Sequence, residues 1–230
     1  MLDHPIFSES IRLIRSLLAE QAAADPALAA RLARLDPLER DVLERCIHSS
    51  GDPSIAADLH FCPGASAAGA AALAAGAPIL TDTAMAAAAV APMVRRSFGN
   101  RVVCLLDWAP DQAPQGSTRS AAGMAGALAA LPEPPLVLIG SAPTALEVLL
   151  EQVAAGLVPA PALVIGMPVG FVGVAESKRH LAASGLAHVR LEGSRGGAAL
   201  VAAACNALLR AAWLQAASAP CPALASESGA

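Results

Sequence analysis

The stretch from Pro135 to Gly166, which reads PLVLIGSAPTALEVLLEQVAAGLVPAPALVIG, decides the fold class. It begins with an apolar run at 135–140 and ends with another at 162–166, and leucine and valine recur at helical spacing between them, over 143–156. Continuous apolar runs separated by a helix are typical of parallel strands that are buried on both faces of a sheet. The stretch therefore predicts a strand–helix–strand unit of an α/β protein.

The same alternation continues along most of the chain. We therefore expect a three-layer α/β fold in which a mostly parallel sheet is covered by helices on both faces. Residues 1–216 are predicted to form a single domain, and residues 217–230, which lack periodicity, a disordered tail. The further apolar runs lie at 78–81, 101–107 and 187–192, and helical stretches lie within 1–40 and near 84–91, 117–130, 174–184 and 196–214.

A helix that ends at a histidine is predicted between these N-terminal residues and the sheet. Asp36 is a suitable N-cap, because proline occupies the next position and an acid lies in the first turn. The helix should end near His48, shortly before Gly51. Several predicted strands end in polar loops, and in open α/β sheets ligands bind beyond the carboxyl ends of the strands. We therefore expect a ligand site at that edge.

Composition excludes several functional classes. The formal net charge is −4, which does not suit binding to nucleic acid or to an anionic membrane surface. Two long stretches, 59–81 and 152–175, carry no charge, but prolines and glycines interrupt both, so they read as buried segments rather than membrane spans. The N-terminus lacks the pattern of a signal peptide. We expect a cytoplasmic protein.

The motifs of common cofactors and metals are missing from the sequence. There is no phosphate-binding G-x-x-x-x-G-K-[ST] run, and the glycines between 166 and 173 do not have dinucleotide-binding spacing. The five cysteines form no C-x-x-C pair, and the five histidines have no metal-ligand spacing. We therefore expect neither a cofactor nor a metal.

Two loops place a guanidinium beside the start of a predicted helix. They are Thr118-Arg119-Ser120 and Ser194-Arg195-Gly196-Gly197. Helix-start N–H groups next to arginine suit a carboxylate or a phosphate. Helix capping without any ligand explains the same residues equally well.

Six segments together resemble the precorrin-8X methylmutase family, which includes the cobalt-precorrin-8 methylmutases. They occur in the family's order, and the fifth is long and specific. The segments are CIHSSGD at 46–52, AGAPILTD at 75–82, STRSAAGM at 117–124, IGSAPTAL at 139–146, VIGMPVGFVGVAESK at 164–178 and GSRGG at 193–197.

The resemblance implies a biochemical role and a dimer. It implies an isomerase of cobalamin biosynthesis that moves a methyl group from C-11 to C-12 of precorrin-8X, or of cobalt-precorrin-8, to give hydrogenobyrinic acid or cobyrinic acid. It also implies a homodimer with the ligand site near the dimer interface. The family's catalytic histidine falls on His48. The chain departs from the family's pattern at Ala84, where an acid is frequent, and at Ser141, where asparagine is common.

A methyl migration of this kind needs no redox cofactor, because the conjugated macrocycle supplies the electrons. The protein can hold one tautomer of the ring and protonate it as the conjugation changes. Imidazole suits that role because its ordinary pKa is about 6.5. The competing interpretation from the sequence is that His48 only caps its helix.

The resemblance and the loop chemistry together predict the residues that bind the acidic macrocycle. Ordinary packing competes with ligand contact for the apolar members, and a surface helix position competes for the lysine. The predicted set is Ser10, Arg15, Thr81, Asp82, Arg119, Ser120, Thr144, Met167, Val169, Gly170, Phe171, Val172, Lys178, Arg195, Gly196 and Gly197.

Two other functions stay open from the sequence. A non-catalytic carrier would bind the corrinoid product and hand it on, and the departure at Ala84 motivates this alternative. Neighbouring enzymes of the corrin pathway are further expected partners. An unrelated α/β protein that binds a small phosphate ester is the third candidate.

Overall fold

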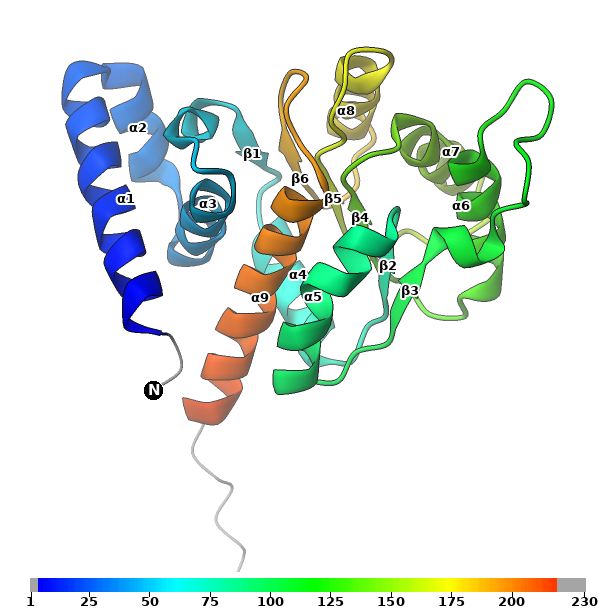
Figure 1. Ribbon diagram of the computed structural model, residues 1–230, viewed down its shortest axis with the longest axis horizontal. Helices are drawn as coiled ribbons and strands as arrows, with labels where there is room; N and C mark the ends of the chain where they lie inside the picture. Colours follow the sequence, from blue (N-terminus) through cyan, green and yellow to red (C-terminus); the bar gives the residue numbers. More distant parts are fainter. Residues whose placement is uncertain (1–3, 219–230) are drawn as a thin grey trace, which may run out of the picture.

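A six-stranded mixed sheet organises the protein, whose computed structural model describes residues 4–218 (Figure 1). The strand order is β1-β6-β5-β4-β2-β3, in which β2 to β6 run parallel and β1 pairs antiparallel with β6. The expected mostly parallel sheet is therefore confirmed. The strands are β1 (Leu59–Phe61), β2 (Ile79–Thr81), β3 (Val102–Cys104), β4 (Leu136–Ile139), β5 (Leu163–Gly166) and β6 (His188–Leu191).

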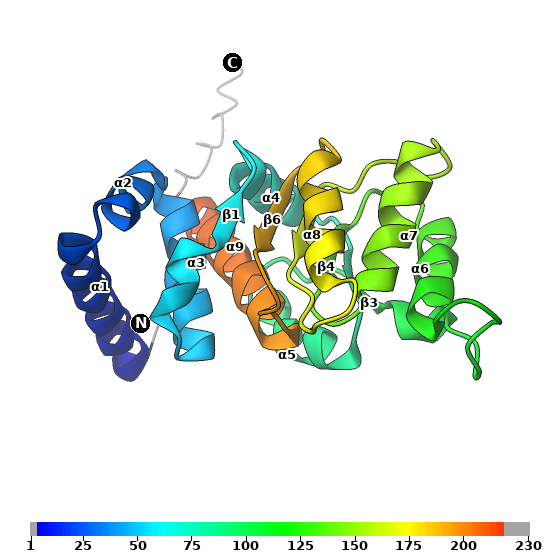
Figure 2. The same cartoon turned by 90° about the horizontal axis from the view of Figure 1, so that it is seen from above.

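Helices cover both faces of the sheet. On one face α9 contacts α3, α4 and α5, and on the other α7 contacts α6 and α8. Figure 2 shows α1 and α2 at one end of the molecule, outside α3. The helices are α1 (Pro5–Ala24), α2 (Pro26–Arg34), α3 (Pro37–Ser50), α4 (Ala65–Ala74), α5 (Ala84–Arg96), α6 (Arg119–Ala130), α7 (Pro143–Ala154), α8 (Val174–Ala183) and α9 (Ala198–Ser218), with short 3₁₀ helices η1 (Pro53–Ala57) and η2 (Leu105–Trp108).

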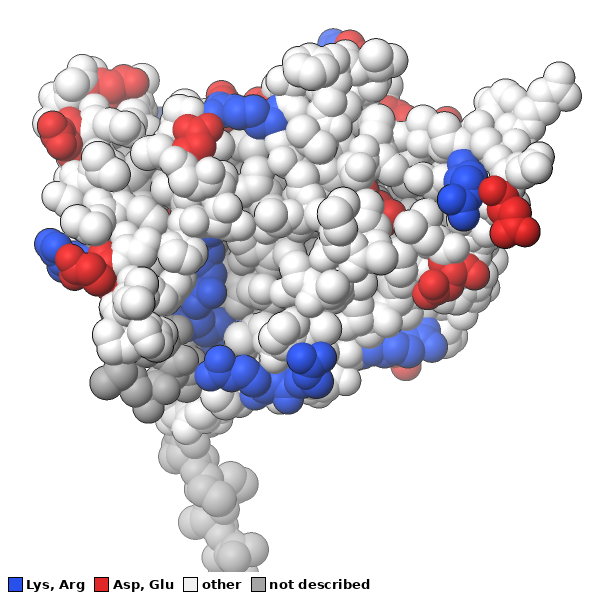
Figure 3. Space-filling view, in the orientation of Figure 1, with Lys and Arg blue, Asp and Glu red and all other residues white. Residues whose placement is uncertain are grey.

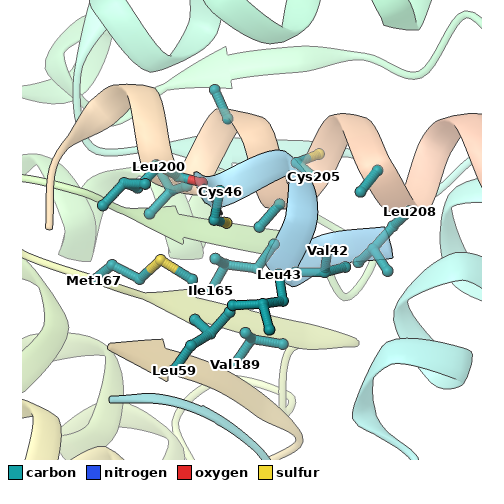
Figure 4. Close-up of a cluster of buried hydrophobic side chains, with 14 of the residues drawn as sticks. Val42, Leu43, Cys46, Leu59, Ile165, Met167, Val189, Leu200, Cys205 and Leu208 are labelled. Atoms are coloured by element: carbon teal, nitrogen blue, oxygen red, sulfur yellow. Dashed lines mark hydrogen bonds between the residues drawn. The ribbon is translucent and has the colours of Figure 1, made fainter. Parts of the chain in front are cut away.

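Alternate residues of each central strand belong to separate hydrophobic cores. In β4, Leu136 and Leu138 pack with α3 and α9, whereas Val137 and Ile139 pack with α6 and α7. The close-up in Figure 4 shows the first core, where side chains of α3 and α9 meet those of β5 and β6. Because both faces are covered, β4 and β5 are apolar and buried at every position, which explains why their sequences show no alternation.

The structure corrects several predicted boundaries. Strand β1 was not expected, because it is only three residues long and its sequence, Leu59-His60-Phe61, carries no strand signal. The apolar run at 101–107 is a strand only to Cys104, and η2 follows. The N-terminal region is two helices, because Asp25 caps a new helix with its side chain. Helix α9 continues to Ser218, beyond the predicted domain end at 216, and residues 219–230 lie outside the described residues.

Helix α9 is the only helix among residues 4–218 that is long and apolar enough to cross a membrane. Half of its apolar stretch is buried inside this fold. Cys205, Ala207 and Leu208 are fully buried, as expected of a core helix. The charge-free stretches at 59–81 and 152–175 are divided among short strands, helices and loops, as their prolines and glycines predict.

Candidate active site

His48 lies in the last turn of α3, as predicted. The helix starts at a capping box of Asp36 and Glu39 and ends at Gly51, whose φ of 68° places it in the left-handed region that favours glycine. The His48 side chain is exposed, and its Nδ1 atom lies 2.7 Å from the Ser10 hydroxyl of α1. Two helices that are far apart in sequence thus fix one ring nitrogen.

Aromatic packing restrains the same ring. The Phe7 ring meets the His48 ring edge to face, with the ring centroids 5.0 Å apart. The Arg45 guanidinium lies over the Phe7 ring, 4.4 Å from its centroid. Sequence reasoning missed Phe7 and Arg45, although each lies three residues before a predicted site residue and therefore on the same helix face.

A groove of about 220 Å³ opens beside His48 between α3, α5 and α9. Half of its lining residues are alanine, so the helix backbones come close to the surface. The Asn206 amide of α9 donates to the carbonyl oxygen of Ala89 in α5 at 3.2 Å and thereby links these two helices across the groove. The groove is lined by Arg45, His48, Ser49, Ala89, Ala199, Ala202, Ala203 and Asn206.

Thr81 and Asp82 lie at the carboxyl edge of the sheet, where they were expected, but both side chains are buried. The Asp82 Oδ2 atom accepts backbone N–H groups from Gly140, Ser141 and Ala142 at 2.6–3.0 Å. Burial raises the pKa of Asp82, and these three hydrogen bonds oppose the rise. The Thr81 hydroxyl donates to main-chain carbonyl groups. Asp82 therefore holds the loops after β2 and β4 together, whereas Thr81 links the end of β2 to β3.

Arg119, Ser120 and Thr144 lie at the starts of α6 and α7, over the other face of the sheet. Thr118 caps α6, and its hydroxyl lies 2.8 Å from that of Thr144. The exposed Arg119 donates from Nε to the carbonyl oxygen of Pro110 at 2.7 Å. The helix starts therefore form one polar surface. No hydrogen bond described for residues 4–218 joins this surface to His48.

The other predicted cations already have partners within the protein. Arg15 forms a two-pronged ion pair with Glu44, a carboxylate that is only 1% exposed. Lys178 is fully buried, which corrects the alternative of a surface helix position. Arg195 pairs with Asp52 and Asp58. Binding of substrate by these side chains would compete with these contacts.

The segment after β5 divides into buried and exposed parts. Met167 is fully buried, so its side chain has no surface to offer a ligand here, whereas Val169, Phe171 and Val172 are 48%, 94% and 89% exposed. Gly196 approaches this segment closely, because a Cβ atom there would lie 1.9 Å from the Met167 carbonyl oxygen. Gly170 and Gly197 have positive φ angles, of 139° and 128°, so both glycines serve the backbone of these loops.

The described residues hold no cluster of three or more histidine, cysteine or carboxylate side chains with metal-binding geometry. What the geometry offers is an exposed imidazole held at one nitrogen, with a groove beside it and apolar and polar surfaces at the ends of the strands. Such a set can move a proton to or from a bound molecule.

Several known proteins with similar sequences are named methylmutases. The sequence model of the family described as precorrin-8X methylmutase matches residues 5–211. The chain is 51% identical to the precorrin-8X methylmutase of Pseudomonas aeruginosa over 169 residues, which cover 71% of this chain and 80% of that protein. It is 35% identical to the cobalt-precorrin-8 methylmutase of Synechocystis over 226 residues, which cover 92% of this chain and 97% of that protein.

The fold leads to the same family. The crystal structure of precorrin-8X methylmutase from Thermus thermophilus superposes with a TM-score of 0.76 at 37% identity, covering 91% of this chain and 98% of that one. The sequence model also spans both the helix that carries His48 and the loops at the ends of the strands. The chain therefore belongs to the precorrin-8X methylmutase family, whose members are methyl-shifting isomerases of cobalamin biosynthesis.

Proposed function

We propose that the enzyme moves the methyl group from C-11 to C-12 of precorrin-8X or its cobalt counterpart, and that His48 moves the accompanying proton. The hydrogen bond of 2.7 Å between Ser10 Oγ and His48 Nδ1 carries this proposal. Because Ser10 occupies Nδ1, the other ring nitrogen, Nε2, is the one left to face a substrate. Ser10 and Phe7 fix the direction of the ring, which a residue that only caps a helix would not need.

The methyl shift itself draws its electrons from the conjugated ring. Protonation at the ring by His48 would lower the barrier as the double bonds move, and general acid catalysis of this kind contributes about 10²–10⁴-fold. No covalent intermediate with the protein is required. The enzyme gains rate by holding the reacting tautomer against a preset imidazole.

We propose a homodimer, because the groove beside His48 is too small to enclose a substrate by itself. Its volume of about 220 Å³ is below the range of about 300–1,000 Å³ that is usual for sites enclosing small ligands. Next to it, α1 presents Ile6, Leu13 and Leu17, which are 72%, 50% and 45% exposed, in line with Ser10 on one helix face. A second copy that covers this face would enlarge and close the site.

Charge on the same side of the molecule suits an acidic substrate. Figure 3 shows basic side chains in the hollow beside α1 and along the lower rim where α5 ends. Arg45 lines the groove, and Arg95 and Arg96 form the last turn of α5. These residues concentrate positive potential beside the groove, on a protein of net charge −4. On the other face of the sheet, Arg119 is exposed as well. We propose Arg119, Ser120, Thr144, Val169, Phe171 and Val172 as substrate contacts.

We also propose that the reaction takes place in the cytoplasm, since corrin synthesis is a biosynthetic activity, and that neighbouring enzymes of the pathway associate with this one. A relative from Archaeoglobus fulgidus, named cobalamin biosynthesis protein CbiHC, supports the association. It is 34% identical over 172 residues, which cover 35% of that longer protein.

Spectra of the purified protein with precorrin-8X test the function against the carrier alternative. An enzyme in catalytic amounts converts the substrate completely, and the absorbance changes to that of the rearranged product. A carrier changes the spectrum only in proportion to the protein added, and free substrate is recovered on denaturation. Recovery of unchanged precorrin-8X after long incubation with active, folded protein would contradict the proposal.

A further inference from the structure

The turn between β6 and α9, residues 193–197, accepts hydrogen bonds from the buried side chain of Lys178. Its Nζ atom donates to the carbonyl oxygens of Gly193 at 2.8 Å and Arg195 at 2.6 Å. The side chain is fully buried, and this burial, together with the charge of Arg195, lowers the pKa of Lys178 to about 8. Burial of a cation costs free energy unless the cation is hydrogen-bonded, so these two hydrogen bonds stabilise the ammonium group in this position.

The same turn is connected to the segment that follows His48. The Arg195 guanidinium donates to Asp52 and to Ser54, both at 2.6 Å, and also to Asp58. Asp52 and Asp58 cap the two ends of η1, which begins directly after the helix that carries His48. Lys178 therefore fixes the main chain of Arg195, and Arg195 fixes the chain that leaves the catalytic helix.

The turn also sets the first turn of α9 against α3. The Gly197 N–H donates to the Met167 carbonyl oxygen at 2.9 Å, which holds the start of α9 at the sheet. The Ser49 hydroxyl and the Cys46 thiol then donate to carbonyl oxygens of Ala199 and Leu200. These two α3 residues lie on either side of His48 in sequence, so a shift of the turn would move the imidazole.

We propose that Lys178 and Arg195 are positioning residues that act on His48 through this turn, and that neither binds the substrate. The inference builds on the proposed role of His48. It differs from a substrate-binding role in its kinetic signature. Displacing the proton donor by about 1 Å lowers the rate of the chemical step by up to about 10²-fold, whereas a lost ligand contact weakens binding.

Steady-state kinetics of Lys178→Met, Arg195→Gln and the double variant test the proposal. We expect kcat to fall about tenfold or more in each single variant, because the donor is misplaced, with KM and product affinity within about twofold of wild type. The double variant should lose no more than the worse single variant, because both act on one turn. Arg179→Met is the matched control on the same helix, since Arg179 is exposed and pairs with exposed Glu176.

Two kinetic results would overturn the proposal. One is unchanged kcat in folded Lys178→Met and Arg195→Gln. The other is a rise in KM or in product Kd with kcat intact, which would make these residues substrate ligands. If Lys178→Met does not fold, Arg195→Gln and Asp52→Asn give the same comparison, because both side chains are more than a third exposed.

Amine acylation tests the turn without using the reaction. Lys178 is the only lysine of the chain, so an acylating reagent has one side-chain amine to modify, with the N-terminal amine as internal reference. We expect slow modification of Lys178 in the wild type and at least tenfold faster modification in Arg195→Gln and Asp52→Asn. Equal rates would overturn the connection between Arg195 and Lys178. A failure of His48 as proton donor would leave this result unchanged.

Discussion

The Ser10 hydroxyl of α1 lies 2.7 Å from Nδ1 of His48, across 38 positions of sequence. Helix α1 thereby holds the imidazole at the end of α3. The same turn of α1 supplies Phe7, whose ring packs against the histidine. Binding of α1 to the body of the protein is therefore directly linked to the orientation of the His48 ring, for which we propose the catalytic role.

Ser10→Ala is expected to lower kcat about tenfold. The variant loses one hydrogen bond of about 0.5–1.5 kcal/mol and frees the ring to rotate. The measurement is turnover of precorrin-8X, with Ser8→Ala, an exposed serine on the same helix, as control. Wild-type kcat in Ser10→Ala would show that the hydrogen bond has no catalytic role.

Asp82→Ala is expected to destabilise the fold by about 3 kcal/mol, because three main-chain N–H groups, one buried and two partly buried, lose their acceptor. Asp82→Asn should cost less, since an amide oxygen can still accept. Urea unfolding measures both, with the exposed Asp111→Asn as control. Equal stability of Asp82→Ala and wild type would contradict the assigned contacts.

Arg119→Ala is expected to weaken binding of the acidic product and to reduce the dependence of its affinity on salt. The guanidinium is exposed and lies at the start of α6, so its loss should leave stability nearly unchanged. Titration of the product at two salt concentrations tests this, with Arg34→Ala in α2 as control. Unchanged affinity at moderate salt would remove Arg119 from the site.

The lowered pKa of His60 predicts that the protein loses stability in mild acid. Burial, with repulsion from Arg31 and Arg190, lowers its pKa to about 4 in the folded state. The unfolded chain, with an ordinary histidine pKa of about 6.5, therefore binds more protons between these values, so stability falls as the pH falls from about 6.5 to 4. His60→Gln should flatten this part of the unfolding free energy curve. The same slope in wild type and His60→Gln would contradict the shift.

The central strands and their helices could be predicted from sequence because buried parallel strands are apolar at every position. Leu136–Ile139 and Leu163–Gly166 were predicted within two residues of their observed ends. Strand β1 could not be predicted, because three residues acquire strand geometry only by pairing with β6. Tertiary contact decides such elements, and local propensity does not.

The site was predictable in part for a similar reason. Helix-end signals place His48 beside Gly51, and they are local in sequence. The partners of the predicted cations are not local: Arg195 pairs with Asp52, 143 positions away, and Lys178 binds main-chain oxygens. A sequence pattern shows that such a cation is unusual, but not whether it faces a ligand or the interior.

A single-turnover experiment with His48→Ala in excess over precorrin-8X tests the central claim most directly, because it separates chemistry from product release. His180→Ala, an exposed histidine that pairs with Glu147, is the control. We predict that His48→Ala binds the macrocycle but rearranges it at least 10²-fold more slowly than wild type. On the time scale of the wild-type reaction, the spectrum should therefore stay that of the substrate. Rearrangement by His48→Ala at the wild-type rate would show that this imidazole does not move the proton.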